Sequence, residues 1–218
     1  MIMNLQQYKS VVFDCDGVLL NSNIVKTQAF YNVALRYGEK PAKLFVDYHV
    51  QNGGVSRYRK FVYLLTEVLG KDLSQIELDL LLTGFADEVK KRLLVCEVTD
   101  GLHELREKTK NVRWHVVSGG DQDELRDIFA GRRLAHLFDG GIFGSPDTKE
   151  QILQREIKRG NIKTPACFLG DSEYDFKASK AAGLDFIFIS GWSEMKDWKT
   201  FCEENFIQYY SSLSQMLL

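Results

Sequence analysis

The sequence predicts an α/β protein in which a parallel sheet is interrupted by an inserted helical domain. From about residue 100 onward, short apolar segments alternate with segments of helical periodicity, which is typical of parallel strands joined by right-handed crossovers. Residues 22–96, in contrast, place apolar residues at helical spacing and contain very little that resembles a strand. We therefore expect a Rossmann-like core made of residues 1–21 and 97–218, with residues 22–96 as a helical cap domain.

The individual elements follow from the same periodicity. Residues 10–13 contain a continuous apolar run, as in a strand buried on both faces. Ser22 is expected to cap a helix that runs to about residue 37. Two further helices of the insert are expected at residues 55–69 and 73–95. The remaining strands are expected at residues 114–117, 142–143, 167–169, 186–189 and 207–210, and the helices between them at 101–109, 121–129, 149–158 and 174–182.

Composition restricts the class of protein. A chain of 218 residues with 44% hydrophobic and 27% charged residues is ordinary for a soluble globular protein. The net charge of −2 provides no basic field that would attract nucleic acid. No apolar stretch approaches the roughly 18 residues that a membrane span needs, and residues 1–7 do not resemble a signal peptide. The four cysteines lack metal-type spacing, so we expect reduced thiols in a cytoplasmic protein.

Polar residues follow four of the predicted strands, at the point where each strand ends. The carboxyl ends of parallel strands meet at one edge of a sheet, so these side chains are expected to lie together. The residues concerned are Asp14 and Asp16, Ser118 and Gly119, Lys149, and Asp171 and Asp175.

Together these groups suit phosphoryl transfer, which depends mainly on positioning and charge neutralisation. Neighbouring carboxylates repel unless a proton or a cation separates them, and Mg²⁺ prefers such oxygen ligands. Taken singly, each group has a plainer interpretation. Asp16-Gly17 fits a turn, Ser118 a helix cap, Lys149 a solvated helix residue, and the two later aspartates a helix start.

In combination, the motifs Asp14-x-Asp16-Gly17-Val18, Ser118 after an apolar strand, Lys149 opening a helix and Gly170-Asp171-x-x-x-Asp175 resemble the haloacid dehalogenase superfamily of phosphohydrolases. The resemblance covers essentially the whole chain. The position of the long insert is similar to that of the helical cap in the group containing β-phosphoglucomutase and phosphoglycolate phosphatase.

The resemblance implies a role for each motif residue. Asp14 corresponds to the nucleophile that forms an aspartyl-phosphate, and Asp16 to the general acid/base. Ser118 and the backbone N–H of Gly119 correspond to phosphate ligands, and Lys149 to the cation that offsets their charge.

The same resemblance implies Mg²⁺ as the cofactor. Its ligands would be Asp14, Asp171 and the backbone carbonyl of Asp16, while Asp175 would act on the metal directly or through water and orient Lys149.

Two residues of the insert are candidates for substrate contact. Gly54-Val55-Ser56-Arg57 resembles the cap loop of β-phosphoglucomutase-like members, in which the arginine contacts the distal end of the substrate; Arg57 equally fits a surface position at a helix start. Lys26 stands where that group usually has histidine, and Gly170 stands where it tends to have an acidic residue. Both departures weigh against a mutase. Lys26 fits either substrate contact or the surface of the cap helix.

The resemblance therefore implies a Mg²⁺-dependent phosphatase for a small phosphorylated metabolite, such as a sugar phosphate. A phosphomutase is the main alternative. A dehalogenase needs neither Asp16 nor a metal, whereas a phosphonate hydrolase would need a cap lysine, which Lys26 or Lys60 could supply. A phospho-acceptor signalling module orders its aspartates differently and has no room for the insert. A non-catalytic phosphoryl-binding protein would not need an intact set of motifs. The oligomeric state cannot be derived from the sequence.

Overall fold

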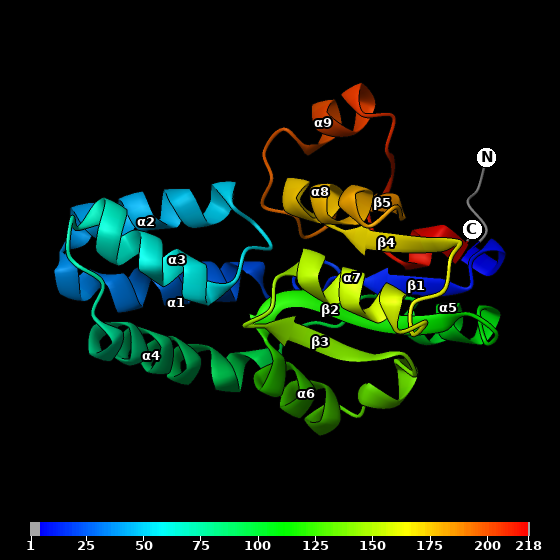
Figure 1. Ribbon diagram of the computed structural model, residues 1–218, viewed down its shortest axis with the longest axis horizontal. Coiled ribbons are helices and arrows are strands. Elements are labelled where there is room, and N and C mark those ends of the chain that lie inside the picture. Colours follow the sequence, from blue (N-terminus) through cyan, green and yellow to red (C-terminus); the bar gives the residue numbers. More distant parts are fainter. Residues whose placement is uncertain (1–4, 218) are drawn as a thin grey trace.

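The computed structural model describes residues 5–217 as a six-stranded sheet flanked by helices, with four more helices beyond the end at which the strands finish (Figure 1). All neighbouring strands are parallel, in the order β3-β2-β1-β4-β5-β6. The α/β fold with a Rossmann-like parallel sheet is therefore confirmed.

The first strand lies in the middle of the sheet and carries the first motif. All four residues of β1 (Ser10–Phe13) are buried, and Val11 aligns with both Trp114 and Cys167 on the neighbouring strands. Its carboxyl end therefore opens at the centre of the sheet edge. The other strands are β2 (Arg113–Asp121), β3 (Gly141–Ser145), β4 (Ala166–Gly170), β5 (Asp185–Ile189) and β6 (Gln208–Tyr210).

Helices cover both faces of the sheet. Alternate residues of β1 belong to different clusters, Val11 and Phe13 to one and Val12 to the other, as expected for a strand buried on both faces. The first cluster includes residues of α5 (Leu102–Lys108) and α6 (Gln122–Gly131). The second includes residues of α7 (Lys149–Lys158), α8 (Glu173–Ala181) and α9 (Trp198–Glu204).

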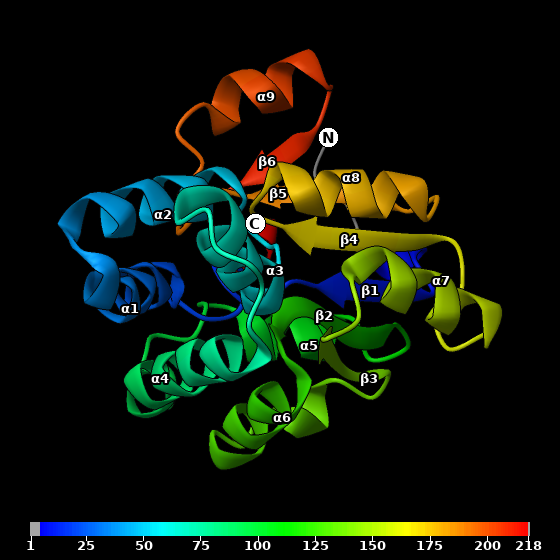
Figure 2. The same cartoon turned by 60° about the vertical axis from the view of Figure 1, so that its left-hand side comes forward.

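The insert between β1 and α5 is helical, as predicted. It contains α1 (Asn23–Ala34), α2 (Glu39–Gln51), α3 (Arg57–Tyr63) and α4 (Gln75–Leu93), with a π-helical turn η3 (Leu64–Val68) after α3. Figure 2 shows α1–α4 gathered in front of the carboxyl ends of the strands. Short 3₁₀ turns lie at η1 (Leu5–Gln7), η2 (Leu35–Tyr37), η4 (Ala135–Leu137) and η5 (Ser214–Leu217).

An aromatic cluster holds the inserted helices together. Phe30 of α1 lies at the centre, with ring centroids 4.3 Å from Phe85 of α4 and 5.4 Å from both Phe45 and Phe61. All four rings are buried. Because one ring comes from each helix, burial of this cluster couples the four helices.

Three local predictions were incomplete or wrong. The second strand does not end before Ser118 but continues to Asp121, with a register shift between Val117 and Asp121 against β3. A bulge of this kind lets a strand bend at a site without ending. Helix α9 was not predicted, because its short sequence is weakly periodic. Ser22 occupies the N-cap position of α1 but makes no capping hydrogen bond, because its hydroxyl donates to Asp16 instead.

None of the helices within residues 5–217 is long and apolar enough to cross a membrane.

Replacing Phe61 by alanine should lower the free energy of unfolding by roughly 3–5 kcal/mol, since it deletes a fully buried ring from the cluster. Urea denaturation followed by circular dichroism measures this. The matched control is Phe206→Ala, whose ring is 96% exposed and whose loss should change stability by less than about 0.5 kcal/mol. Equal effects of the two substitutions would contradict the packing role of the cluster.

Candidate active site

A cavity of about 620 Å³ lies between the carboxyl edge of the sheet and the inserted helices. The core contributes Asp14, Asp16 and Asp171 to its lining, and the insert contributes Lys26 and Lys60 among others. The predicted meeting of strand-end residues at one edge is therefore present, and residues of the inserted helices line the same cavity.

Three aspartates lie close together here, and two of them, Asp14 and Asp171, line the cavity. Asp14 follows β1, Asp171 follows β4, and Asp175 lies in the first turn of α8. All three are buried, and their carboxylate oxygens lie within 4.8 Å of one another. These three residues are among the metal ligands predicted from the sequence. The side chain of Asp16 is not part of the cluster.

Lys149 balances part of this negative charge. Its Nζ lies 2.9 Å from Asp14 Oδ1 and also pairs with Asp175, and the side chain is fully buried. The lysine opens α7 because Thr148 and Gln151 form a capping box that fixes the start of that helix. The predicted pairing of Lys149 with Asp175 is therefore present.

Burial and crowding disturb the titration of the cluster. Burial raises the pKa of Asp14 to about 7. The Asp175 carboxylate also raises this pKa, whereas the Lys149 ammonium lowers it. Burial, Asp14 and Asp175 raise the pKa of Asp171 well above its usual range. For Lys149, burial alone would lower the pKa, but the two carboxylates raise it.

One ammonium therefore leaves excess negative charge on three close carboxylates. These oxygen ligands fit a hard divalent cation such as Mg²⁺, which would relieve that repulsion.

Two glycines permit the approach of these carboxylates. Gly17 has a φ of +76°, and a Cβ there would stand 2.0 Å from Asp171 Oδ2. At Gly170 a Cβ would lie 2.4 Å from the Cβ of Asp175. The residue before Asp171 must therefore be small here, which explains the departure from the acidic residue of the related group.

Neighbouring polar groups hold the aspartates in place. Ser172 Oγ donates to Asp175 Oδ2 at 2.6 Å. Asn23 Nδ2, from the start of α1, donates to Asp171 Oδ2 at 2.9 Å. Asn23 carries no signal in the sequence, because only the tertiary fold brings α1 to the end of β4.

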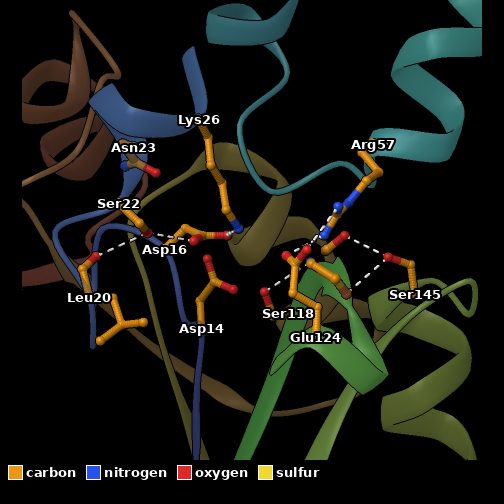
Figure 3. A network of polar contacts seen from close by, with 12 residues as sticks. Asp14, Asp16, Leu20, Ser22, Asn23, Lys26, Arg57, Ser118, Glu124 and Ser145 are labelled. Carbon is orange, nitrogen blue, oxygen red and sulfur yellow. Dashed lines mark hydrogen bonds and ion pairs between the residues drawn. The ribbon is translucent and has the colours of Figure 1, made fainter. Parts of the chain in front are cut away.

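Asp16 is held apart from the other carboxylates by the insert. Figure 3 shows its two oxygens accepting from Ser22 Oγ and from Lys26 Nζ, the latter at 2.6 Å. Burial alone would raise the pKa of Asp16, but Lys26 and Ser22 hold it below its usual range. Lys26 is therefore a buried ion-pair partner of Asp16 and does not lie on the cap surface.

Ser118 and Gly119 lie in the bulged end of β2. Ser118 is buried and its Oγ accepts from the N–H of Gly120 at 3.1 Å. Ser145 of β3 donates to the carbonyl oxygens of Gly119 and Gly120 at 2.7 and 2.9 Å (Figure 3). No pattern in the sequence indicated this role of Ser145.

The loop between α2 and α3 lies directly on this strand end. A Cβ on Gly119 would stand 2.2 Å from the carbonyl oxygen of Gly54. The insert therefore closes on the core at the predicted phosphate ligands, and a side chain at residue 119 would prevent this approach.

The side chain of Arg57 is paired with a residue of the core helix α6. Its guanidinium forms two hydrogen bonds with the Glu124 carboxylate, one of them at 3.2 Å (Figure 3). The adjacent Tyr58 donates to Asp121 at 2.7 Å. A contact between Arg57 and the substrate stays a prediction, and in this structure the side chain joins the insert to the core. No sequence signal distinguished Glu124 from other helix-start acids.

Comparison with known proteins agrees with this geometry. Residues 8–183 match the family model of the haloacid dehalogenase-like hydrolases, a span that includes all four motifs. The chain belongs to this family. It is accordingly a hydrolase, as the sequence predicted.

Solved structures show the same fold at low sequence identity. A predicted phosphatase from Clostridium acetobutylicum is 19% identical, with a TM-score of 0.73 and 96% of each chain covered. A predicted phosphoglycolate phosphatase from Haemophilus somnus is 20% identical, with a TM-score of 0.64 over 85% of this chain and 87% of that one. A candidate β-phosphoglucomutase from Thermotoga maritima is 22% identical, with a TM-score of 0.62 over 93% and 94%.

One curated protein matches locally. Porphobilinogen deaminase of Thermus thermophilus is 32% identical over 114 residues, which is 46% of this chain. The chain spans 38% of the length of that relative. A match of this extent does not transfer the deaminase activity.

The raised pKa of Asp14 predicts that the stability difference between the wild type and Asp14→Asn depends on pH. Between about pH 4 and 7 the folded, metal-free hydrolase holds a proton that the unfolded chain releases, so this group makes the free energy of unfolding fall as pH rises. Asp14→Asn removes that contribution. The free energy of unfolding of Asp14→Asn, relative to that of the wild type, should rise by at least about 1 kcal/mol between pH 5 and pH 8. One pKa unit corresponds to about 1.4 kcal/mol.

Urea denaturation in chelator-containing buffer at the two pH values measures this gain. Glu107→Gln, at an exposed helix position, is the control and should show no comparable change. A pH-independent difference between wild type and Asp14→Asn would contradict the stated environment of Asp14.

The Arg57–Glu124 pair should contribute to stability as a coupled unit. Arg57→Met leaves a largely buried Glu124 carboxylate without its partner, at a cost of about 3 kcal/mol. The double variant Arg57→Met, Glu124→Met should cost clearly less than the sum of the single variants. A double-mutant cycle by denaturation tests this, and simple additivity would show that the two side chains are not coupled.

Proposed function

We propose that this hydrolase is a Mg²⁺-dependent phosphatase that acts on a small phosphorylated metabolite, a sugar phosphate among the candidates, through an aspartyl-phosphate intermediate. The observation that carries the proposal is the placement of Asp14: a buried carboxylate at the centre of the sheet edge, 2.9 Å from the Lys149 ammonium, in the lining of the cavity. A carboxylate held in this way suits covalent catalysis on phosphorus.

The proposed division of the chain is that of the sequence analysis, with residues 22–96 as a cap. Contacts from the cap reach three parts of the site, through Asn23 to Asp171, Lys26 to Asp16, and Gly54 to Gly119. Opening of the cap would admit substrate, and closure would exclude bulk water from the reacting groups.

The proposed cation would be held by Asp14, Asp171 and the backbone carbonyl of Asp16, with Asp175 nearby, and would supply neutralisation of phosphoryl charge. In the first step an Asp14 oxygen bonds to phosphorus, and the bond from phosphorus to the ester oxygen breaks. Asp16 provides the proton for the departing alkoxide. Lys149, with Ser118 and the Gly119 N–H, would bind the phosphoryl oxygens.

In the second step water attacks the phosphorus of the aspartyl-phosphate. Asp16 takes the proton from this water, the bond between Asp14 and phosphorus breaks, and inorganic phosphate is released. The ionised state of Asp16 beside Lys26 suits this role as a base. It also means that Asp16 must gain a proton before it can act as the acid of the first step.

The deciding experiment measures phosphate release from a panel of phosphorylated metabolites with and without Mg²⁺, alongside an isomerisation assay with β-glucose-1-phosphate. Mg²⁺-dependent release from a few compounds supports the phosphatase. Isomerisation without net release favours the phosphomutase alternative. Lack of both activities, with p-nitrophenyl phosphate also inert, contradicts the proposal.

Asp14→Asn should reduce phosphate release by about 10⁴-fold or more, because an amide cannot form the aspartyl-phosphate. The folded state should persist, as checked by circular dichroism. Asp123→Asn, which changes a carboxylate with a 92% exposed side chain, serves as the control and should retain activity. Substantial turnover by the Asp14→Asn variant would exclude Asp14 as the nucleophile.

Asp16→Asn should slow alkyl phosphates by about 10²- to 10⁴-fold, and aryl phosphates clearly less, because poor leaving groups depend on the acid. Comparison of kcat for ethyl phosphate and p-nitrophenyl phosphate tests this. An equal loss on both substrates would argue against the acid role of Asp16.

A further inference from the structure

Lys60 is a buried lysine in the lining of the catalytic cavity, and the proposed mechanism does not use it. It lies in α3 with 2% of its surface exposed. Among the ion pairs of residues 5–217 there is none between Lys60 and a carboxylate. Its Nζ instead lies 2.6 Å from His49 Nδ1 and 5.5 Å from the centre of the Phe30 ring.

A chain of hydrogen bonds behind Lys60 fixes this arrangement. Thr27 Oγ1 donates to the Glu194 carboxylate at 3.0 Å and therefore accepts from His49 Nε2, also at 3.0 Å. The proton of neutral His49 is thus on Nε2, which leaves Nδ1 free to accept from Lys60. Burial, Lys60 and Lys26 lower the pKa of His49 well below its usual range, in agreement with a neutral ring.

The charge on Lys60 is poorly compensated. Burial and the nearby Lys26 lower its pKa to about 7, against the weaker opposing effects of Asp16 and Glu194. Its other close partners are a neutral ring and the His49 carbonyl. A buried ammonium without a carboxylate partner is costly, so binding of an anion beside it would be favourable.

The other buried cations around the cavity are already paired. Lys26 is bound by Asp16, Lys149 by Asp14 and Asp175, and Arg57 by Glu124. Within the described residues, Lys60 is therefore the buried cation of this site whose charge remains available to a ligand.

We propose that Lys60, oriented by His49, binds a second anionic group of the substrate, so that the enzyme selects phosphomonoesters that carry a carboxylate or another phosphoryl group. The inference deepens the proposed phosphatase function and rests on it. A charge-assisted hydrogen bond to this buried ammonium would give a preference of roughly 10- to 100-fold over compounds with an uncharged tail.

The test uses phosphonates, which bind but are not hydrolysed. Calorimetric titration in the presence of Mg²⁺ compares 3-phosphonopropionate with propylphosphonate, which has no carboxylate. Phosphonoacetate and 4-phosphonobutyrate, each against its alkyl counterpart, vary the distance between the charges. Propane-1,3-bisphosphonate shows whether a second phosphoryl group is preferred to a carboxylate.

The expected result is at least a tenfold preference of the wild-type protein for one of the doubly anionic ligands. Lys60→Met should abolish this preference and leave alkylphosphonate binding within about twofold, while Lys60→Arg should restore part of it. Lys43→Met, which removes a lysine with a 65% exposed side chain from α2, is the matched control and should behave as wild type.

Absence of any preference in the wild-type protein overturns the inference, even if Lys60→Met fails to fold. A preference that survives undiminished in Lys60→Met also overturns it. The two proposals fail separately: a protein that releases phosphate from p-nitrophenyl phosphate without this preference retains the phosphatase function alone. One that shows the preference but hydrolyses no phosphate ester retains the Lys60 site and loses the phosphatase proposal.

Discussion

The Lys149 ammonium is the interaction on which the site depends. It lies between Asp14 and Asp175, which are brought together from the end of β1 and the first turn of α8. Without that charge the two buried carboxylates would repel each other directly. One ammonium among three aspartates is nevertheless insufficient, and the raised pKa values of Asp14 and Asp171 express the remaining excess. The same imbalance between these charged groups would favour a divalent cation held by the three carboxylates.

Close backbone approach is the second constraint. The loop after β1 meets Asp171 at Gly17, the end of β4 meets α8 at Gly170, and the 52–56 loop meets β2 at Gly119. At each point a Cβ would stand less than 2.5 Å from its neighbour. Side chains from separate strands converge on one cavity because their backbones are able to come this close.

The insert does more than cover the core. Lys26 and Ser22 set the ionisation of Asp16, Asn23 orients Asp171, and the Arg57–Glu124 pair joins the two parts of the chain. Residues of the insert therefore supply hydrogen-bond and ion-pair partners to carboxylates of the core. Lys26 and Arg57 pair with core carboxylates in this way, whereas Lys60 has no carboxylate partner in the described part of the chain.

The sequence by itself determined the α/β class, the helical insert and the four strand-end motifs, because local periodicity and motif order survive without tertiary information. It also identified every member of the Asp14, Lys149, Asp171 and Asp175 cluster. Only the tertiary structure decided how individual side chains are used. Ser22 donates a hydrogen bond to Asp16 instead of capping its own helix. Arg57 pairs with Glu124, and Lys60 is hydrogen-bonded to His49. These partners are far apart in the chain or compete with a local alternative, so no spacing rule could have selected them.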